Sequence, residues 1–111
     1  MNFNTDNYKL SLFTELECED CIKIKEQLKL KGIPFVNRCI TANTPQGHIN
    51  ENKDNRWDFV DADRDNPGKI KFTPVMILED IKGNVEYLSA GVAFETVEEA
   101  LTILEEKYSK S

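Results

Sequence analysis

Hydrophobic and polar positions at the start of the chain follow the patterns of a strand, a helix and a second strand. Residues 8–13 alternate between apolar and polar side chains, which predicts a β-strand. Residues 18–31 are rich in helix formers with apolar side chains three or four positions apart, and Gly32 stands where a left-handed C-cap would end a helix. Residues 33–40 are β-rich, and Pro34 is near their start, where a strand tolerates proline. This order predicts a βαβ unit with parallel strands.

The last third of the chain predicts a hairpin followed by a helix. Residues 73–79 form an apolar run, residues 82–84 form a turn and residues 85–88 return, so the two strands should pair antiparallel. Thr96 and Glu99 fit a capping box, and an apolar stripe continues from there towards the end of the chain. We therefore expect a closing helix that covers the sheet.

The middle of the chain gives no clear pattern. Residues 41–55 are polar without a convincing period, and residues 56–62 fit either the end of a helix or a short strand. Asn-Pro-Gly at 66–68 is a strong turn signal, and residues 69–72 would add one helical turn after it. The pattern alone leaves the structure of residues 41–72 open.

Two aromatic residues stand in this undecided segment. Trp57 and Phe59 could line a groove for a partner. Aromatic residues beside an apolar residue such as Val60 are more often buried, so we expect both in the core.

Length, composition and charge indicate one acidic globular domain. The chain has 111 residues, 40% hydrophobic and 31% charged, so we expect a flexible tail over residues 1–7 and a single domain over residues 8–111. Its 20 acidic and 14 basic residues give a net charge of −6, which makes nucleic acid a poor partner. Because the sequence shows neither a bilayer-spanning apolar run nor a secretion signal, we expect a cytoplasmic protein without a membrane partner.

Three cysteines carry the candidate chemistry. An odd number without a secretion signal argues against a disulfide framework and for catalytic, metal-binding or buried thiols. Cys18 and Cys21 form a C-x-x-C at the start of a predicted helix, where unpaired N–H groups and the helix dipole favour a thiolate at Cys18. Cys21, one turn further on, can resolve the mixed disulfide that Cys18 would form. We therefore predict a dithiol–disulfide oxidoreductase with Cys18 as nucleophile; the alternatives are a zinc or iron–sulfur module and a redox-inactive acidic adaptor.

The run from Leu12 to Cys21, followed by a helix and Gly32-Ile33-Pro34-Phe35, resembles the glutaredoxin and small-redoxin branch of the thioredoxin superfamily. Thr73-Pro74-Val75 resembles the second signature of that family. The resemblance covers residues 8–40 and 72–107 and implies an α/β, thioredoxin-like fold with a four-stranded mixed sheet flanked by helices. It also implies a cis peptide bond at Pro74 and substrate binding by Thr73 and Pro74. Gly91 resembles the turn residue that approaches glutathione in glutaredoxins, although a plain turn glycine is an equal alternative.

Acidic residues around the cysteines depart from that family. Glutaredoxins commonly have a proline and an aromatic residue between the cysteines, where this chain has Glu19 and Asp20, and a lysine shortly before them, where it has Glu15. Glu17 replaces the tryptophan of thioredoxins. These carboxylates are either a solvated face or a field that opposes ionisation of Cys18 and repels anionic glutathione. We expect a monomeric enzyme without a cofactor that reduces protein disulfides and is recycled by a reductase or, less favourably, by glutathione.

Cys39 and His48 complete the candidate metal ligands. With Cys18 and Cys21 they would make a Cys₃His set, but their spacing fits no recognised zinc finger. We therefore expect no metal, with Cys39 as a small buried residue and His48 as a solvated loop residue.

Overall fold

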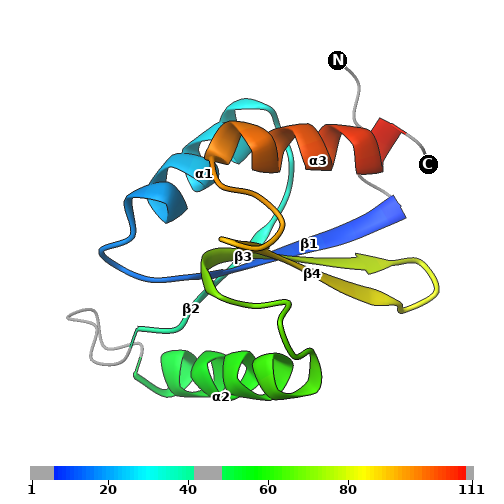
Figure 1. The fold of residues 1–111 in the computed structure, drawn as a ribbon. Coiled ribbons are helices and arrows are strands. Elements are labelled where there is room, and N and C mark those ends of the chain that lie inside the picture. The colour runs from blue at the N-terminus through cyan, green and yellow to red at the C-terminus, as the bar shows by residue number, and fades with distance from the viewer. Residues whose placement is uncertain (1–6, 42–48, 110–111) are drawn as a thin grey trace.

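The computed structural model describes residues 7–41 and 49–109, which form one mixed sheet with helices on both faces (Figure 1). In chain order the elements are β1 (Tyr8–Thr14), α1 (Glu19–Leu30), β2 (Val36–Cys39), α2 (Ile49–Asp65), β3 (Phe72–Asp80), β4 (Val85–Ala90) and α3 (Val97–Ser109). The four strands lie in the order β2-β1-β3-β4; β1 and β2 are parallel, and the other neighbouring pairs are antiparallel. The predicted α/β fold with a four-stranded mixed sheet flanked by helices is confirmed. The predicted tail over residues 1–7 lies, except for Asn7, outside the described residues.

Alternating side chains of the two central strands fill a core on each face of the sheet. In Figure 1, α1 and α3 lie over one face and α2 lies against the other. Because consecutive strand residues point to opposite faces, the period of two in the sequence decides which side chains meet which helices. The central-strand residues in the core under α1 and α3 are Leu10, Leu12, Met76 and Leu78, and those in the core facing α2 are Phe13, Val75 and Ile77.

The predicted C-terminal end of α1 and the predicted N-terminal start of α3 are confirmed. Gly32 follows α1 in the expected left-handed conformation, with φ +70°. At the start of α3, the Glu99 N–H donates to Thr96 Oγ1 over 3.1 Å, which is one of the two hydrogen bonds of a capping box. Within residues 7–41 and 49–109, none of the helices combines the length and the apolar character that crossing a membrane needs.

Two predicted local structures are wrong. β2 begins only at Val36, which pairs with Ser11, whereas the sequence pattern predicts a strand from residue 33. Pro34 has no N–H to donate to a ladder with β1, which explains the later start. Residues 69–72 form no helical turn, because Phe72 already belongs to β3 and the Lys71 N–H donates to Ser89 Oγ over 2.9 Å. In place of the predicted turn, Lys71 and Phe72 contact β4.

α2 occupies most of the segment that the pattern leaves undecided. Asn55, Phe59 and Ala62 are spaced by four and three positions and turn one face of the helix to the protein. An asparagine and an alanine in this stripe weaken its apolar periodicity, so the helix is hard to see in the sequence. Trp57 lies on the opposite face and is 58% exposed, so its prediction as a core residue is wrong. Phe59 is half-buried, and its ring packs edge-on against Phe13 with centroids 5.3 Å apart.

Candidate active site

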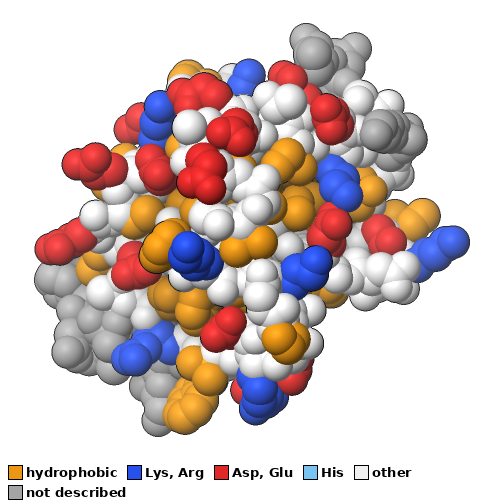
Figure 2. All heavy atoms as spheres, in the orientation of Figure 1, with side chains coloured by type: hydrophobic (Ala, Val, Ile, Leu, Met, Phe, Trp, Pro, Cys, Tyr) orange, Lys and Arg blue, Asp and Glu red, His pale blue; other side chains and the backbone are white. Residues whose placement is uncertain are grey.

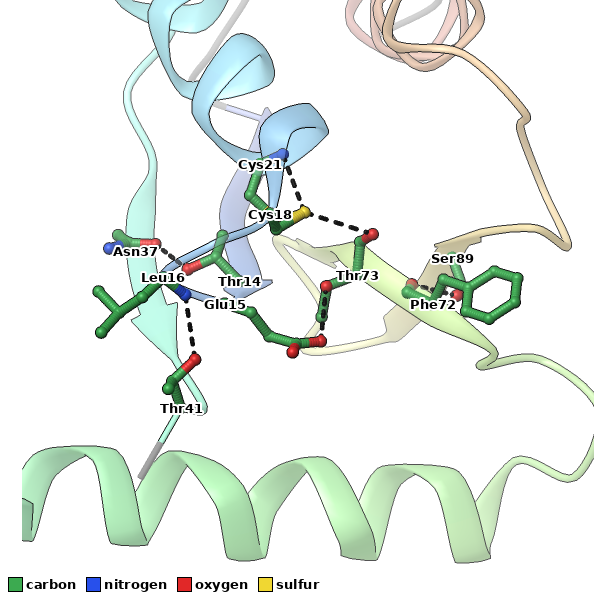
Figure 3. Close-up of a disulfide and its surroundings, with 10 residues drawn as sticks. All are labelled: Thr14, Glu15, Leu16, Cys18, Cys21, Asn37, Thr41, Phe72, Thr73 and Ser89. Atoms are coloured by element: carbon green, nitrogen blue, oxygen red, sulfur yellow. Dashed lines mark hydrogen bonds between the residues drawn. A yellow bond between two sulfur atoms is a disulfide. The ribbon is translucent and has the colours of Figure 1, made fainter. Parts of the chain in front are cut away.

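Cys18 and Cys21 are joined by a disulfide at the N-terminus of α1 (Figure 3). Their Cα atoms are 5.1 Å apart. Cys18 is the N-cap of α1, and its Sγ accepts a hydrogen bond from the Cys21 N–H over 3.1 Å. Cys21 is fully buried, whereas Cys18 is partly exposed. Of the two cysteines, Cys18 is therefore the one that an incoming reactant can contact.

The loop between β1 and α1 is fixed on the side of β2. The Thr14 hydroxyl donates to Asn37 Oδ1 over 2.6 Å where β1 ends. Two residues later, the Leu16 N–H donates to Thr41 Oγ1 over 3.0 Å. The Cys18 N–H then closes a turn on the Glu15 carbonyl over 3.4 Å. These bonds hold the chain where β1 leads into the helix, so the position of Cys18 relative to the sheet is set before α1 begins.

Thr73 and Pro74 lie beside the disulfide, at the start of β3. The peptide bond between them is cis, as the family resemblance implied. The Thr73 carbonyl oxygen is 3.7 Å from Cys18 Sγ, although the two residues are 55 positions apart in the sequence. The described strand register jumps from Phe72↔Ala90 to Val75↔Ser89, so Thr73 and Pro74 stand in a bulge opposite β4. Backbone groups of Thr73 are thus outside the ladder with β4, next to Cys18 Sγ.

Ser89, on β4, hydrogen-bonds to the backbone beside this bulge, a role that the sequence does not reveal. The side chain is fully buried. Its Oγ accepts from the Lys71 N–H over 2.9 Å and donates to the Phe72 carbonyl, also at 2.9 Å. One hydroxyl therefore satisfies two backbone groups at the start of β3, next to the bulge. A serine within a strand pattern gives no sign of this role until the register is known.

Glu15 also has a structural role that sequence reasoning missed. The Thr73 hydroxyl donates to Glu15 Oε1 over 2.9 Å, which ties the loop before α1 to the start of β3 across 58 positions of sequence. Figure 3 shows the Glu15 side chain extending towards Thr73, on the side of the site away from α1. The acidic residue is visible in the sequence, but its partner is not.

Gly91 lies next to Phe72, which immediately precedes Thr73. It follows β4 with φ +83°, and a Cβ placed there would come within 2.7 Å of Phe72 Cδ2. The structure therefore brings Cys18, Cys21, Thr73 and Pro74 together. Gly91 lies against Phe72, the neighbour of Thr73 in the sequence. Its contact with a substrate stays a prediction.

Acidic side chains dominate the surface around the helix start. Figure 2 shows many acidic and few basic side chains where Figure 1 places α1. The four carboxylates close to the cysteines are Glu15, Glu17, Glu19 and Asp20, all exposed. Among the ion pairs of the described residues, none involves these four. The cation that follows them in sequence, Lys23, pairs with Glu98 over 2.8 Å, which raises the pKa of Lys23 and lowers that of Glu98.

The structure gives no sign of a metal site in the part of the chain that it describes. No group of three or more His, Cys, Asp or Glu residues is placed to hold an ion there. Cys39 is free and only half-buried, so its prediction as a buried residue is wrong; it ends the edge strand β2, where its carbonyl accepts from Asn55 Nδ2 over 3.1 Å. His48 lies outside the described residues.

Comparison with known proteins bears on the fold alone. No family model and no curated protein matches the chain. Among solved structures, the chain is similar to maleylacetoacetate isomerase from Anaeromyxobacter dehalogenans, whose crystal structure has glutathione bound in the active site. The TM-score is 0.52 at 15% sequence identity, over 95% of this chain. The match covers 40% of the isomerase chain, so this chain spans less than half of that protein's length. Together with the strand order, this likeness establishes a thioredoxin-like fold.

Proposed function

We propose that this protein is a thiol–disulfide oxidoreductase that reduces disulfides in polypeptides through Cys18 and Cys21. The observation that carries the proposal is the unequal placement of the two sulfurs. Cys18 is partly exposed at a helix N-terminus and 3.7 Å from the Thr73 carbonyl, whereas Cys21 is buried behind it. Backbone N–H groups at a helix N-terminus stabilise a thiolate, which is the attacking species in disulfide exchange. This arrangement supports Cys18 as the nucleophile and Cys21 as the resolving cysteine.

The reaction begins with the reduced protein. The Cys18 thiolate attacks one sulfur of the substrate disulfide, forms a mixed disulfide and releases the other substrate sulfur as a thiolate, which takes up a proton. Cys21 then loses its proton, and its thiolate attacks Cys18 Sγ. The Cys18–Cys21 disulfide forms, and the second substrate sulfur leaves as a thiolate that takes up the proton lost by Cys21. The substrate has gained two electrons from the protein and two protons, one from Cys21 and one from solvent, and the protein is left in the disulfide form that the structure holds.

An extended substrate backbone fits at the start of β3, beside Cys18. Thr73 lies in the bulge, so its backbone groups are outside the ladder with β4. A polypeptide that runs past Thr73 can hydrogen-bond there as an added strand segment would, which aligns its disulfide with Cys18. This supports a polypeptide substrate, because such contacts need a peptide backbone on both sides of the substrate cysteine.

An external thiol must return the protein to the dithiol form. A dithiol reductase protein is the first candidate. Glutathione is the second, because the isomerase that shares this fold has glutathione bound in its active site. The exposed carboxylates around Cys18 oppose glutathione, which carries a net negative charge at neutral pH. Recycling by glutathione with glutathione reductase, measured beside recycling by thioredoxin with thioredoxin reductase, separates the two.

The test is reduction of insulin disulfides with dithiothreitol as electron donor. We expect Cys18→Ser to abolish the protein-dependent rate. Reduced Cys21→Ser, freed of dithiothreitol and mixed with insulin, should accumulate a mixed disulfide that mass spectrometry detects. Cys39→Ser is the matched control, since it removes the third thiol without touching the pair, and it should keep the parent rate. A Cys18→Ser variant as active as the parent would overturn the proposal. An inactive parent would favour the redox-inactive adaptor, and zinc or iron bound in stoichiometric amount would favour the metal module.

A further inference from the structure

We propose that Glu15 determines substrate specificity at this site and selects disulfides flanked by cationic residues over disulfides flanked by anionic ones. The inference rests on the proposed function and adds the chemical class of the substrate. Glu15 takes no part in bond making. Its carboxylate acts on the chain that carries the substrate cysteine.

The Glu15 carboxylate is held at the path that a substrate must follow. Thr73 links this carboxylate to Cys18, because its hydroxyl contacts Glu15 and its carbonyl lies near Cys18 Sγ. The Thr73 hydroxyl donates to Glu15 Oε1 over 2.9 Å, and the Thr73 carbonyl lies 3.7 Å from Cys18 Sγ. Only one oxygen of the carboxylate is occupied by this bond, so the other can accept from a substrate ammonium or guanidinium. A substrate residue beside the attacked cysteine therefore passes close to a fixed negative charge.

The hydrogen bond with Thr73 distinguishes Glu15 from the other carboxylates around the cysteines. Among the side-chain hydrogen bonds of the described residues, one involves Glu15, and none involves Glu17, Glu19 or Asp20. A mobile exposed carboxylate gains little from an ion pair, because the side chain loses rotamer freedom when it forms. For Glu15 that freedom is already restricted by the bond with Thr73. The loss of side-chain entropy therefore offsets less of the Coulomb attraction to a substrate charge at Glu15 than at the other three carboxylates.

Among the described residues, no ion pair joins Glu15 to a cation. The Lys71 ammonium lies 5.1 Å from the centroid of the Phe72 ring, so it is engaged above that ring. Arg56, on α2, lines a surface hollow together with Glu15, but no ion pair joins the two among the described residues. Glu15 thus keeps its negative charge available for a partner brought by the substrate.

Two disulfide-bonded peptides that differ only beside the cysteine test the inference. One carries lysine and the other glutamate on each side of the cysteine. We measure kcat/KM for both at low ionic strength with the parent, Glu15→Gln, Thr73→Val and the control Glu79→Gln. Glu79→Gln makes the same change of net charge at the far end of β3, six residues and about 20 Å from Thr73 along an extended strand. Circular dichroism confirms that each variant is folded.

The parent should prefer the lysine peptide by about tenfold, since one peptide gains and the other loses an exposed charge interaction of about threefold each. Glu15→Gln removes both interactions, so it should reduce this ratio by about tenfold, to near one, and Glu79→Gln should leave it unchanged. Thr73→Val keeps the charge but frees the carboxylate, so it should reduce the ratio by a smaller amount. Salt at about 1 M, with a Debye length of about 3 Å, should also reduce it.

Each outcome separates this inference from the proposed function. If the parent reduces both peptides at equal rates, or if Glu15→Gln changes the ratio no more than Glu79→Gln does, the selection by Glu15 is wrong while the oxidoreductase stands. If the parent reduces neither peptide, the proposed function itself fails.

Discussion

Replacing Gly91 by alanine should destabilise the protein by about twice as much as the same change at Gly83. Both glycines have left-handed backbones, with φ +83° at Gly91 and +86° at Gly83. A Cβ at Gly83 would meet no atom within 4 Å, whereas a Cβ at Gly91 would come within 2.7 Å of Phe72 Cδ2 and 3.2 Å of Lys71 Cδ. The pair therefore separates the backbone cost of alanine from the cost of the contact with Phe72.

The size of each cost follows from the local geometry. An alanine in a left-handed backbone costs about 1 kcal/mol of unfolding free energy at either position. Overpacking costs about 1–3 kcal/mol, and the lower end applies at Gly91. The Phe72 ring is 58% exposed and can swing aside, so most of the surrounding structure need not move. We expect a loss of about 1 kcal/mol for Gly83→Ala and about 2 kcal/mol for Gly91→Ala.

Urea denaturation followed by circular dichroism measures both losses. Phe72→Ala removes the ring that the new methyl group meets, so in that background Gly91→Ala should cost no more than Gly83→Ala. Because Phe72 precedes Thr73, Gly91→Ala should also lower kcat/KM for insulin disulfides, and Gly83→Ala should not. Equal losses for the two alanine variants in the parent background would refute the reasoning, as would an extra cost at Gly91 that survives in Phe72→Ala.

Three further predictions address other contacts. Ser89→Ala should lower the free energy of unfolding by about 1–2 kcal/mol in urea titrations, because it leaves the Lys71 N–H and the Phe72 carbonyl without their buried partner; a loss below about 0.5 kcal/mol would mean that water replaces the hydroxyl. Asn55→Ala should cost about 1–3 kcal/mol in the same measurement, because its buried side chain donates to the Cys39 carbonyl and accepts from Arg38 Nε, each over 3.1 Å. Burial raises the pKa of Tyr108 from 10.0 to about 12, so the folded protein holds this proton more tightly than the unfolded chain. The stability from this group should be complete below pH 10 and fall as the pH rises towards 12; Tyr108→Phe should show a shallower fall, and an equal slope for both proteins would contradict the assignment.

Local interactions explain why much of the fold can be predicted from the sequence. The alternation in residues 8–13, the stripe and glycine end of α1, and the Thr96 capping box each depend on residues within four positions of one another. The C-x-x-C pair belongs to the same class, because its placement at a helix start follows from the strand and helix patterns around it. The structure therefore shows these features where the sequence pattern predicts them.

The α2 segment could not be predicted because its helix depends on a weak stripe that contacts the sheet. The side-chain contacts of the site are also beyond the sequence. Cys18 and Thr73 are 55 positions apart, and Glu15 and Thr73 are 58 positions apart, so neither contact leaves a local pattern. Only the pairing of β1 with β3 and the bulge opposite Ser89 bring these groups together. The sequence determined which sulfur stands at the helix start, and the strand register decided which carbonyl and which carboxylate stand beside it, because register is set by packing across the whole sheet.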